Sequence, residues 1–209
     1  LMNIISGVLI PDVGDVFING EQVVHLPEYK RSKYIGRVFQ DPMAGTAPSM
    51  TIEENLAMAY SRNKKRKLKL GVTKQRKTLN LGLENRLTAK VGLLSGGERQ
   101  ALSLLMSTFT EPDILLLDEH TAALDPSRAE LITDLTEKVV RESGLTTLMV
   151  THNMQQALDL GSRLIMMDKG QIIFDVSGKE KEKLTIQDLL HEFQRIRGEQ
   201  FGDDRAVLT

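Results

Sequence analysis

Leu94-Ser95-Gly96-Gly97-Glu98-Arg99-Gln100 and, shortly after it, Ile114-Leu115-Leu116-Leu117-Asp118-Glu119 are the two segments that decide the fold. Glycine has no Cβ, so the Ser-Gly-Gly turn lets several backbone N–H groups approach an anion, and a helix that begins there adds the positive end of its dipole. The apolar run of the second segment predicts a strand buried on both faces. Asp118 and Glu119 therefore follow the C-terminal end of a strand, where open α/β sheets bind ligands.

Polar side chains also follow two other predicted strands. Gln40 ends the strand-like run 34–39, and His152 ends the run 147–151. Because parallel strands meet ligands at their C-terminal ends, we expect Gln40, the Asp118-Glu119 pair and His152 to converge on one edge of the sheet. This pattern indicates nucleoside triphosphate chemistry.

In this order, the motifs resemble those of the ATP-binding subunits of ABC transporters. The matching segments are the Q-loop (Gln40), the signature (Leu94 to Gln100), the Walker B strand (Ile114 to Glu119), the D-loop (Ala123-Leu124-Asp125) and the switch histidine (His152). One departure is His120, where relatives usually have a proline or a small residue.

The resemblance implies an α/β fold with a P-loop NTPase-like, mostly parallel sheet flanked by helices, an antiparallel β part and an inserted α-helical subdomain. The expected division has four parts. They are a partial N-terminal ATPase core with antiparallel elements (1–40), a helical subdomain ending in the signature (41–100), the remaining ATPase core (101–176), and a C-terminal helix with a polar tail (177–209).

The resemblance also implies ATP and Mg²⁺ as cofactors. Asp118 would hold Mg²⁺ through water, because Mg²⁺ keeps several waters and takes few carboxylates. Glu119 would be the general base, Gln40 would complete the metal shell and position water, and His152 would donate an N–H to the γ-phosphate. A histidine buried against backbone is the alternative for His152 taken alone.

A second anion site is implied at the signature. Ser95, Gly96, Gly97 and Glu98 would face the nucleotide of the opposite subunit in a head-to-tail dimer, and Asp125 would lie at that junction. Taken alone, the Ser-Gly-Gly turn is equally consistent with an ordinary helix start.

No G-x-x-x-x-G-K-[ST] loop occurs in the chain, although such a loop is the main phosphate-binding device of this class. Leu1 to Gly7 resemble the helix that directly follows that loop. We therefore expect that the sequence begins just after the Walker A segment and that residues 1–209 alone do not hydrolyse ATP.

Composition sets further bounds on the class of protein. With 209 residues, 41% hydrophobic and 26% charged, the chain is long enough for one substantial core. A formal net charge of -1 gives no reason to expect nucleic-acid binding. The absence of cysteine excludes a disulfide framework, and no apolar run reaches about 18 residues, the length of a membrane span.

The predicted function is ATP hydrolysis that energises an ABC transporter from the cytoplasmic face of the plasma membrane. The expected partners are a second ATP-binding subunit, in a homodimer, transmembrane permease subunits and a substrate-binding protein. The sequence resembles lipoprotein-release, macrolide-efflux and amino-acid-import subunits, and we favour import. A soluble non-transport ABC ATPase and a catalytically silent ABC subunit stay open as alternatives.

Local signals predict individual elements. Asn19-Gly20 indicates a hairpin between 15–18 and 21–24, and Thr51 with Glu54 predicts a helix start. Asp125, Pro126 and Gly144 delimit another helix. Further strands are expected at 146–150, 164–167 and 171–174, and a last helix after Thr185. The basic stretch 62–77 is expected to be a solvated loop rather than a partner-binding patch.

Overall fold

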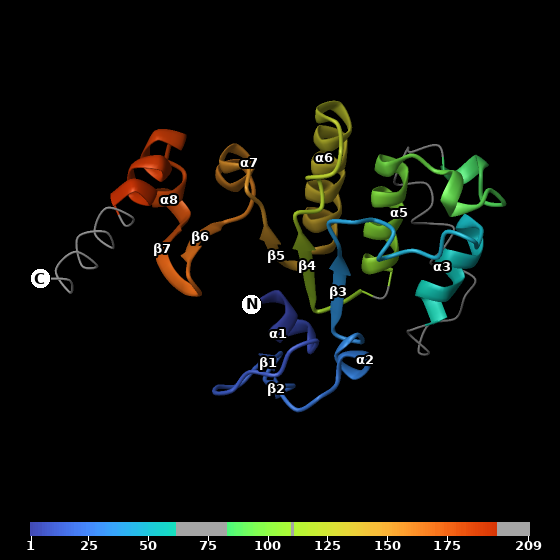
Figure 1. Cartoon of the computed structure of the whole chain (residues 1–209), viewed down its shortest axis with the longest axis horizontal. Coiled ribbons are helices and arrows are strands. Elements are labelled where there is room, and N and C mark those ends of the chain that lie inside the picture. Colours follow the sequence, from blue (N-terminus) through green and yellow to red (C-terminus); the bar gives the residue numbers. More distant parts are fainter. Residues whose placement is uncertain (62–82, 110, 196–209) are drawn as a thin grey trace, which may run out of the picture. The chain divides into compact units, whose positions relative to one another are not determined.

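A computed structural model describes residues 1–61, 83–109 and 111–195 (Figure 1). The basic stretch 62–77 therefore lies outside the described residues. The chain divides into two compact units, residues 1–150 and 151–209, which are described separately below.

The centre of the first unit is a three-stranded parallel sheet in the order β3-β4-β5. Its strands are β3 (Ile35–Val38), β4 (Ile114–Asp118) and β5 (Thr146–Val150). β4 lies between the other two, and its leucines Leu115, Leu116 and Leu117 are at most 1% exposed. An apolar run without alternation is what a strand covered on both faces requires.

The leucines of β4 point alternately to two separate cores. Leu115 and Leu117 pack with Val38 and with residues of α5 (Gly96–Thr108) and α6 (Pro126–Ser143). Leu116 packs on the opposite face with Met2 and other residues of the N-terminal segment. The sheet is thus an inner layer covered on both sides, as the predicted fold class requires.

The two long helices begin and end at the residues that the sequence indicates. Asp125 is the N-cap of α6, accepts a 3.2 Å hydrogen bond from the Arg128 N–H, and precedes Pro126 at the first helical position. Gly144 ends this helix with φ 62°, in the left-handed region that favours glycine. α5 packs against both β3 and α6 (Figure 1).

The N-terminal segment forms α1, a short hairpin and α2. Their bounds are α1 (Met2–Ser6), β1 (Phe17–Ile18), β2 (Glu21–Gln22) and α2 (Glu28–Arg31). The antiparallel hairpin is confirmed but is shorter than the prediction. Val23 and Val24 follow β2 and are 0% and 4% exposed, because they enter the core.

A buried arginine links these N-terminal elements. The Arg31 side chain is fully buried and donates only to carbonyl oxygens: Ile4 at 2.7 Å, Ile5 at 3.0 Å, Leu26 at 2.8 Å and Val24 at 2.5 Å. The carbonyls at a helix C-terminus lack intrahelical partners, so Arg31 caps α1. A Cβ at Gly7 would lie 2.9 Å from Arg31 Nε, and the φ of Gly7 is 87°.

A helical part precedes the signature. Its elements are α3 (Ile52–Ser61) and two 3-10 turns, η1 (Leu83–Asn85) and η2 (Val91–Leu93). The predicted helix start is confirmed, because the Thr51 N–H donates to Glu54 Oε2 at 2.7 Å and the Glu54 N–H donates to Thr51 Oγ1 at 3.2 Å. α3 packs against α5.

The second unit contains an antiparallel pair, β6 (Arg163–Asp168) and β7 (Gln171–Ser177), which confirms the predicted edge pair. It also contains α7 (Met154–Asp159), α8 (Gly178–Lys181) and helical residues 186–195. Leu164, Val176 and Leu189 form its small core. Thr185 begins the last helix as predicted, since its Oγ1 accepts from the Asp188 N–H at 3.3 Å. Across the described parts of both units, we find no helix long and apolar enough to cross a bilayer.

Candidate functional site

The register of the parallel sheet places two of the predicted motifs at one edge. Val38 of β3 pairs with Leu117 of β4. Gln40 and Glu119 each come two residues after these paired positions, on neighbouring strands. Asp118 pairs with Val150, and the Glu119 N–H donates to the Val150 carbonyl at 3.0 Å. The C-terminal ends of the three strands therefore form a common edge, as parallel strands must.

Glu119 has an unusual backbone for a non-glycine residue. Its φ is +44°, in the left-handed region, and its carbonyl accepts a 2.9 Å hydrogen bond from the Ala122 N–H. Residues held in this region often lie at functional sites, because the surrounding structure must enforce the conformation. The sequence did not predict this feature.

Asp118 carries the accessible carboxylate at the end of β4. Its side chain is 36% exposed, and its Oδ2 lies 3.0 Å from Arg37 Nη2, which comes from β3. Sequence reasoning did not identify Arg37, because an ion pair between residues 81 positions apart leaves no local signal.

The signature turn forms the N-terminus of α5. Ser95 is the N-cap, and a capping box is present: the Glu98 N–H donates to Ser95 Oγ at 3.3 Å and the Ser95 N–H donates to Glu98 Oε2 at 2.7 Å. The first N–H groups of a helix have no intrahelical partner. Since the capping box uses those of Ser95 and Glu98, the N–H groups of Gly96 and Gly97 are the ones that an anion could bind.

Glu98 is held as a carboxylate at this turn. Its pKa is lowered first by the hydrogen bond from the Ser95 N–H and further by Arg86, whose Nη1 lies 2.7 Å from Glu98 Oε1. The resulting charge at the helix N-terminus stabilises α5, because it complements the helix dipole.

The D-loop contacts the signature turn within the same chain. A Cβ at Gly97 would lie 3.2 Å from Arg128 Cδ, and one at Gly96 would lie 3.4 Å from Leu124 Cδ2. Gly97 is buried. The two glycines therefore permit the close packing of the signature turn against the segment that follows Asp125, a contact that a larger residue would push apart.

The signature helix is also joined to the strand before the Q-loop. Gln100, 1% exposed, donates from Nε2 to the Phe39 carbonyl at 3.0 Å, and Ser107 Oγ donates to the Arg37 carbonyl at 2.7 Å. These side chains satisfy carbonyls of β3 and of the residue that follows it, on the side where no neighbouring strand lies among the described residues. Gln40 therefore directly follows a residue that is bonded to α5.

His120, the departure from the family pattern, is a buried part of the core. It is 2% exposed, and its Nε2 lies 3.1 Å from Thr136 Oγ1 of α6. Burial lowers the pKa of His120 to about 4, because desolvation disfavours the imidazolium. The neutral ring thus links the turn that follows β4 to α6.

His152 belongs to the second unit. It follows β5 by two residues and directly precedes Asn153, which is the N-cap of α7 and accepts from the Gln156 N–H at 3.1 Å. Its convergence with Gln40 and Glu119 stays a prediction.

Comparisons with known proteins agree with these motifs. The model of the ABC transporter family matches residues 1–122. A tyrosine transport ATP-binding protein of Clostridioides difficile is 47% identical over 201 residues, which cover 93% of this chain and 80% of that protein. A thiamine import ATP-binding protein, ThiQ of Brucella suis, is 35% identical over 82% of this chain and 69% of its own length. A molybdate/tungstate import ATP-binding protein, WtpC of Thermococcus kodakarensis, is 33% identical over 83% of this chain and 51% of its own length.

Solved structures show the same fold. A dimeric ATP-binding cassette in a post-hydrolysis state with ADP and Pi has a TM-score of 0.70 and 27% identity, covering 84% of this chain and 78% of that one. The ADP conformation of an ATP-binding cassette of an ABC transporter has a TM-score of 0.72 and 27% identity, covering 92% and 81%.

This chain belongs to the ABC transporter family. It is an ATP-binding subunit, a peripheral component that binds ATP with Mg²⁺, hydrolyses ATP and energises transport through separate membrane subunits, and such cassettes act as dimers. These findings confirm the predicted family, fold class, cofactors and activity.

The residues present fit Mg²⁺ with a nucleotide. Within the described residues no group of three or more histidine, cysteine, aspartate or glutamate side chains could hold a metal by itself. Mg²⁺ does not need such a cage, because it uses one or two carboxylates together with waters and the phosphates of its substrate. The half-exposed carboxylate of Asp118 at a strand end provides that kind of ligand.

Proposed function

We propose that the edge formed by Gln40, Asp118 and Glu119 is the catalytic half of an ATP site. The observation that carries the proposal is the register of β3, β4 and β5, which aligns the C-terminal ends of these strands. Bound Mg²⁺ would neutralise charge on the phosphates. Asp118 would hold the ion through water, and the Gln40 amide oxygen would complete its shell.

Glu119 would accept the proton of the attacking water. Its fixed left-handed backbone supports this role, because a general base must be held within hydrogen-bond reach of the water it activates. His152 would donate an N–H to the γ-phosphate and so distinguish ATP from ADP. Both roles agree with the established activity of the family.

The N-terminus of α5 would serve the partner subunit. The N–H groups of Gly96 and Gly97 and the hydroxyl of Ser95 would bind the phosphates of the nucleotide held by a second copy of this chain. Glu98 would fix the turn through the capping box, and Asp125 would lie at the junction. The contact of Gly97 with Arg128 supports coupling between these two segments.

A substitution of Glu119 tests the proposed base. In the full-length protein, we expect Glu119→Gln to lower ATP hydrolysis by at least about 10²-fold while ATP binding is retained. Glu111→Gln is a matched control, because Glu111 also has a left-handed backbone, with φ +48°, but precedes β4 at the opposite end of the strand. Hydrolysis by Glu119→Gln close to the wild-type rate would remove Glu119 from this role.

We further propose that the transporter imports an amino acid, with the chain bound to permease subunits at the cytoplasmic face of the membrane and a substrate-binding protein on the other side. The similarity to the tyrosine transport protein, over 93% of this chain, supports tyrosine or a related aromatic amino acid. The division 1–40, 41–100, 101–176 and 177–209 is our proposal for the functional parts, with the helical subdomain contacting the permease.

Transport in reconstituted vesicles tests this proposal. The full-length protein, purified with its membrane subunits and placed in proteoliposomes, should drive ATP-dependent uptake of labelled tyrosine, while labelled thiamine serves as a control solute. Uptake of thiamine with no uptake of tyrosine would contradict the assigned substrate class.

A further inference from the structure

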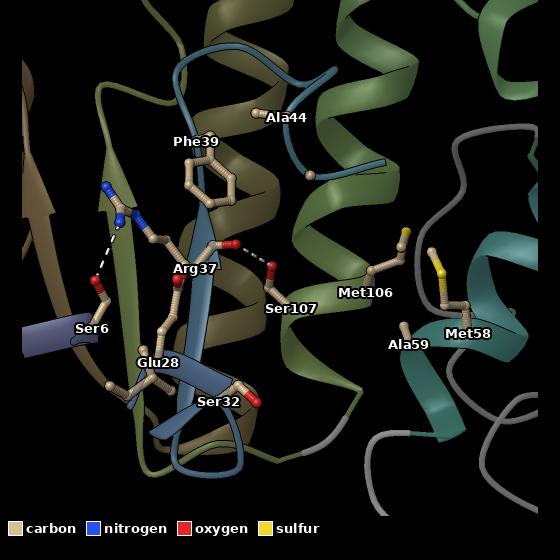
Figure 2. A pocket seen from close by; sticks show the side chains of 12 residues that line it. Ser6, Glu28, Ser32, Arg37, Phe39, Ala44, Met58, Ala59, Met106 and Ser107 are labelled. Atoms are coloured by element: carbon tan, nitrogen blue, oxygen red, sulfur yellow. Dashed lines mark hydrogen bonds between the residues drawn. The ribbon is translucent and has the colours of Figure 1, made fainter. Parts of the chain in front are cut away.

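Arg37 is a charged residue in the middle of a buried strand. It lies on β3 between Gly36 and Val38, and its side chain is 14% exposed. Its guanidinium carbon lies 4.7 Å from the centroid of the Phe39 ring, close enough for a cation–π contact. Figure 2 shows Arg37 and Phe39 side by side at one wall of a cavity of about 310 Å³.

The Arg37 guanidinium contacts two elements besides its own strand. Nη2 donates to Asp118 Oδ2 at 3.0 Å and to Asn3 Oδ1 of α1 at 2.9 Å. Nη1 donates to Ser6 Oγ at 3.3 Å, the bond drawn in Figure 2. Arg37 therefore joins α1 to the carboxylate at the end of β4.

This network is less completely bonded than that of Arg31. All four bonds of Arg31 go to backbone carbonyls, whereas Arg37 Nε is buried and has no hydrogen-bond partner among the described residues. A buried donor without a partner is costly, so structural stability alone is a poor explanation for an arginine at this position. Among the residues that the structure describes, the ion pair of Arg37 is with Asp118.

We propose that Arg37 is an internal counter-ion that holds the Asp118 carboxylate when no metal is bound and opposes the binding of Mg²⁺ there. The inference rests on the proposed role of Asp118 as the metal-binding carboxylate. One carboxylate cannot neutralise both a guanidinium and a divalent cation, and the two cations repel each other in this partly buried site. Arg37 thus reduces metal affinity and transmits the change to α1 through Asn3.

The test compares metal affinities in the full-length protein. Mn²⁺ replaces Mg²⁺ as a probe because free Mn²⁺ can be counted by electron paramagnetic resonance, and ADP is kept saturating in every sample. We expect Arg37→Met to bind Mn²⁺ about tenfold more tightly than the wild type, since a like charge is removed. Arg37→Lys keeps the charge and should change the affinity far less.

Two further variants make the result specific. Arg141→Met removes an arginine from an exposed ion pair with Glu137 near the C-terminus of α6, so it should leave the Mn²⁺ affinity unchanged. Asp118→Asn should weaken Mn²⁺ binding. If it does not, the proposed role of Asp118 fails; if it does and Arg37→Met binds Mn²⁺ no more tightly than the wild type, only the counter-ion inference fails.

A measurement without metal provides a second readout. In EDTA, the effects of Arg37→Met and Asp118→Asn on the unfolding equilibrium constant should be non-additive, because each substitution removes the same ion pair. Additive effects would overturn the inference. If Arg37→Met does not fold, Arg37→Gln replaces it in both measurements, since glutamine removes the charge and retains a donor for Asn3.

Discussion

The side-chain amide of Gln100 is bonded to the carbonyl of Phe39 at 3.0 Å, so the signature helix is attached to the residue that directly precedes Gln40. Both groups are on the same compact unit, and the Gln100 side chain is 1% exposed. The end of β3 cannot move away from α5 without breaking this bond. The Q-loop and the signature helix are therefore held together through two residues that are 61 positions apart.

Loss of the Gln100 bond should be measurable. We expect Gln100→Met to lower the free energy of unfolding by about 1 to 2 kcal/mol, because the Phe39 carbonyl loses its partner inside the protein. Chemical denaturation measures this change. Ser103→Ala is a control on the same helix, since Ser103 Oγ is buried with no partner among the described residues and its removal should cost nothing.

Substitutions in the two capping boxes should distinguish an effect on stability from an effect on ATP hydrolysis. Ser95→Ala and Thr51→Ala should each destabilise the protein by about 1 kcal/mol, because each removes an N-cap with the same geometry. Only Ser95→Ala should also lower ATP hydrolysis by the full-length protein, by about tenfold or more, because only Ser95 is proposed to bind phosphate. Equal activity of the two variants would argue against the proposed anion site.

Removal of Arg31 should be far more damaging than removal of an exposed arginine. Arg31→Met leaves the carbonyls of Ile4, Ile5, Val24 and Leu26 without their donor. We expect a loss of about 3 kcal/mol or more in unfolding free energy, as for other buried charged networks. Arg141→Met, whose side chain is 78% exposed, should change the unfolding free energy by less than about 0.5 kcal/mol.

His120 should make stability depend on pH. Its pKa falls from 6.5 to about 4 on folding, so below pH 6.5 the unfolded chain binds a proton that the folded protein does not. The contribution of His120 to the free energy of unfolding is therefore fully present above pH 6.5. It falls by about 3 kcal/mol in total as the pH decreases towards 4. Urea unfolding between pH 4 and pH 7 measures the slope.

His120→Gln should flatten that slope, because glutamine does not titrate. His25→Gln is the matched control, because it makes the same substitution at an exposed histidine. A slope that persists in His120→Gln would assign the pH dependence to other groups.

Helix boundaries and strand positions were predictable because their signals are local. Asp125 with Pro126, Thr51 with Glu54, and Gly144 are all within a few residues of the ends that they define. The apolar run of β4 likewise predicted its own burial. The strand-end positions of Gln40, Asp118 and Glu119 followed from these elements.

Contacts between distant segments were not predictable. Nothing near Arg37 in the sequence indicates Asp118, and nothing near His120 indicates Thr136, 16 positions away on the next helix. The exposed or buried state of such residues depends on how the elements pack. The second strand of the hairpin was also predicted to be too long. Val23 and Val24 have a local preference for strand, but they lie in the core beyond the end of β2.

The bonds of Arg31 make one attachment of α1 insensitive to the salt concentration. Carbonyl groups carry no net charge and do not titrate, so ions in solution have little to screen at the Arg31 anchor. The bond between Arg37 and Asp118 joins two full charges at a partly exposed site and weakens as ionic strength rises. The short helix α1 is thus held by two arginines: Arg31, whose bonds to carbonyls are insensitive to ionic strength, and Arg37, whose ion pair with Asp118 responds to it.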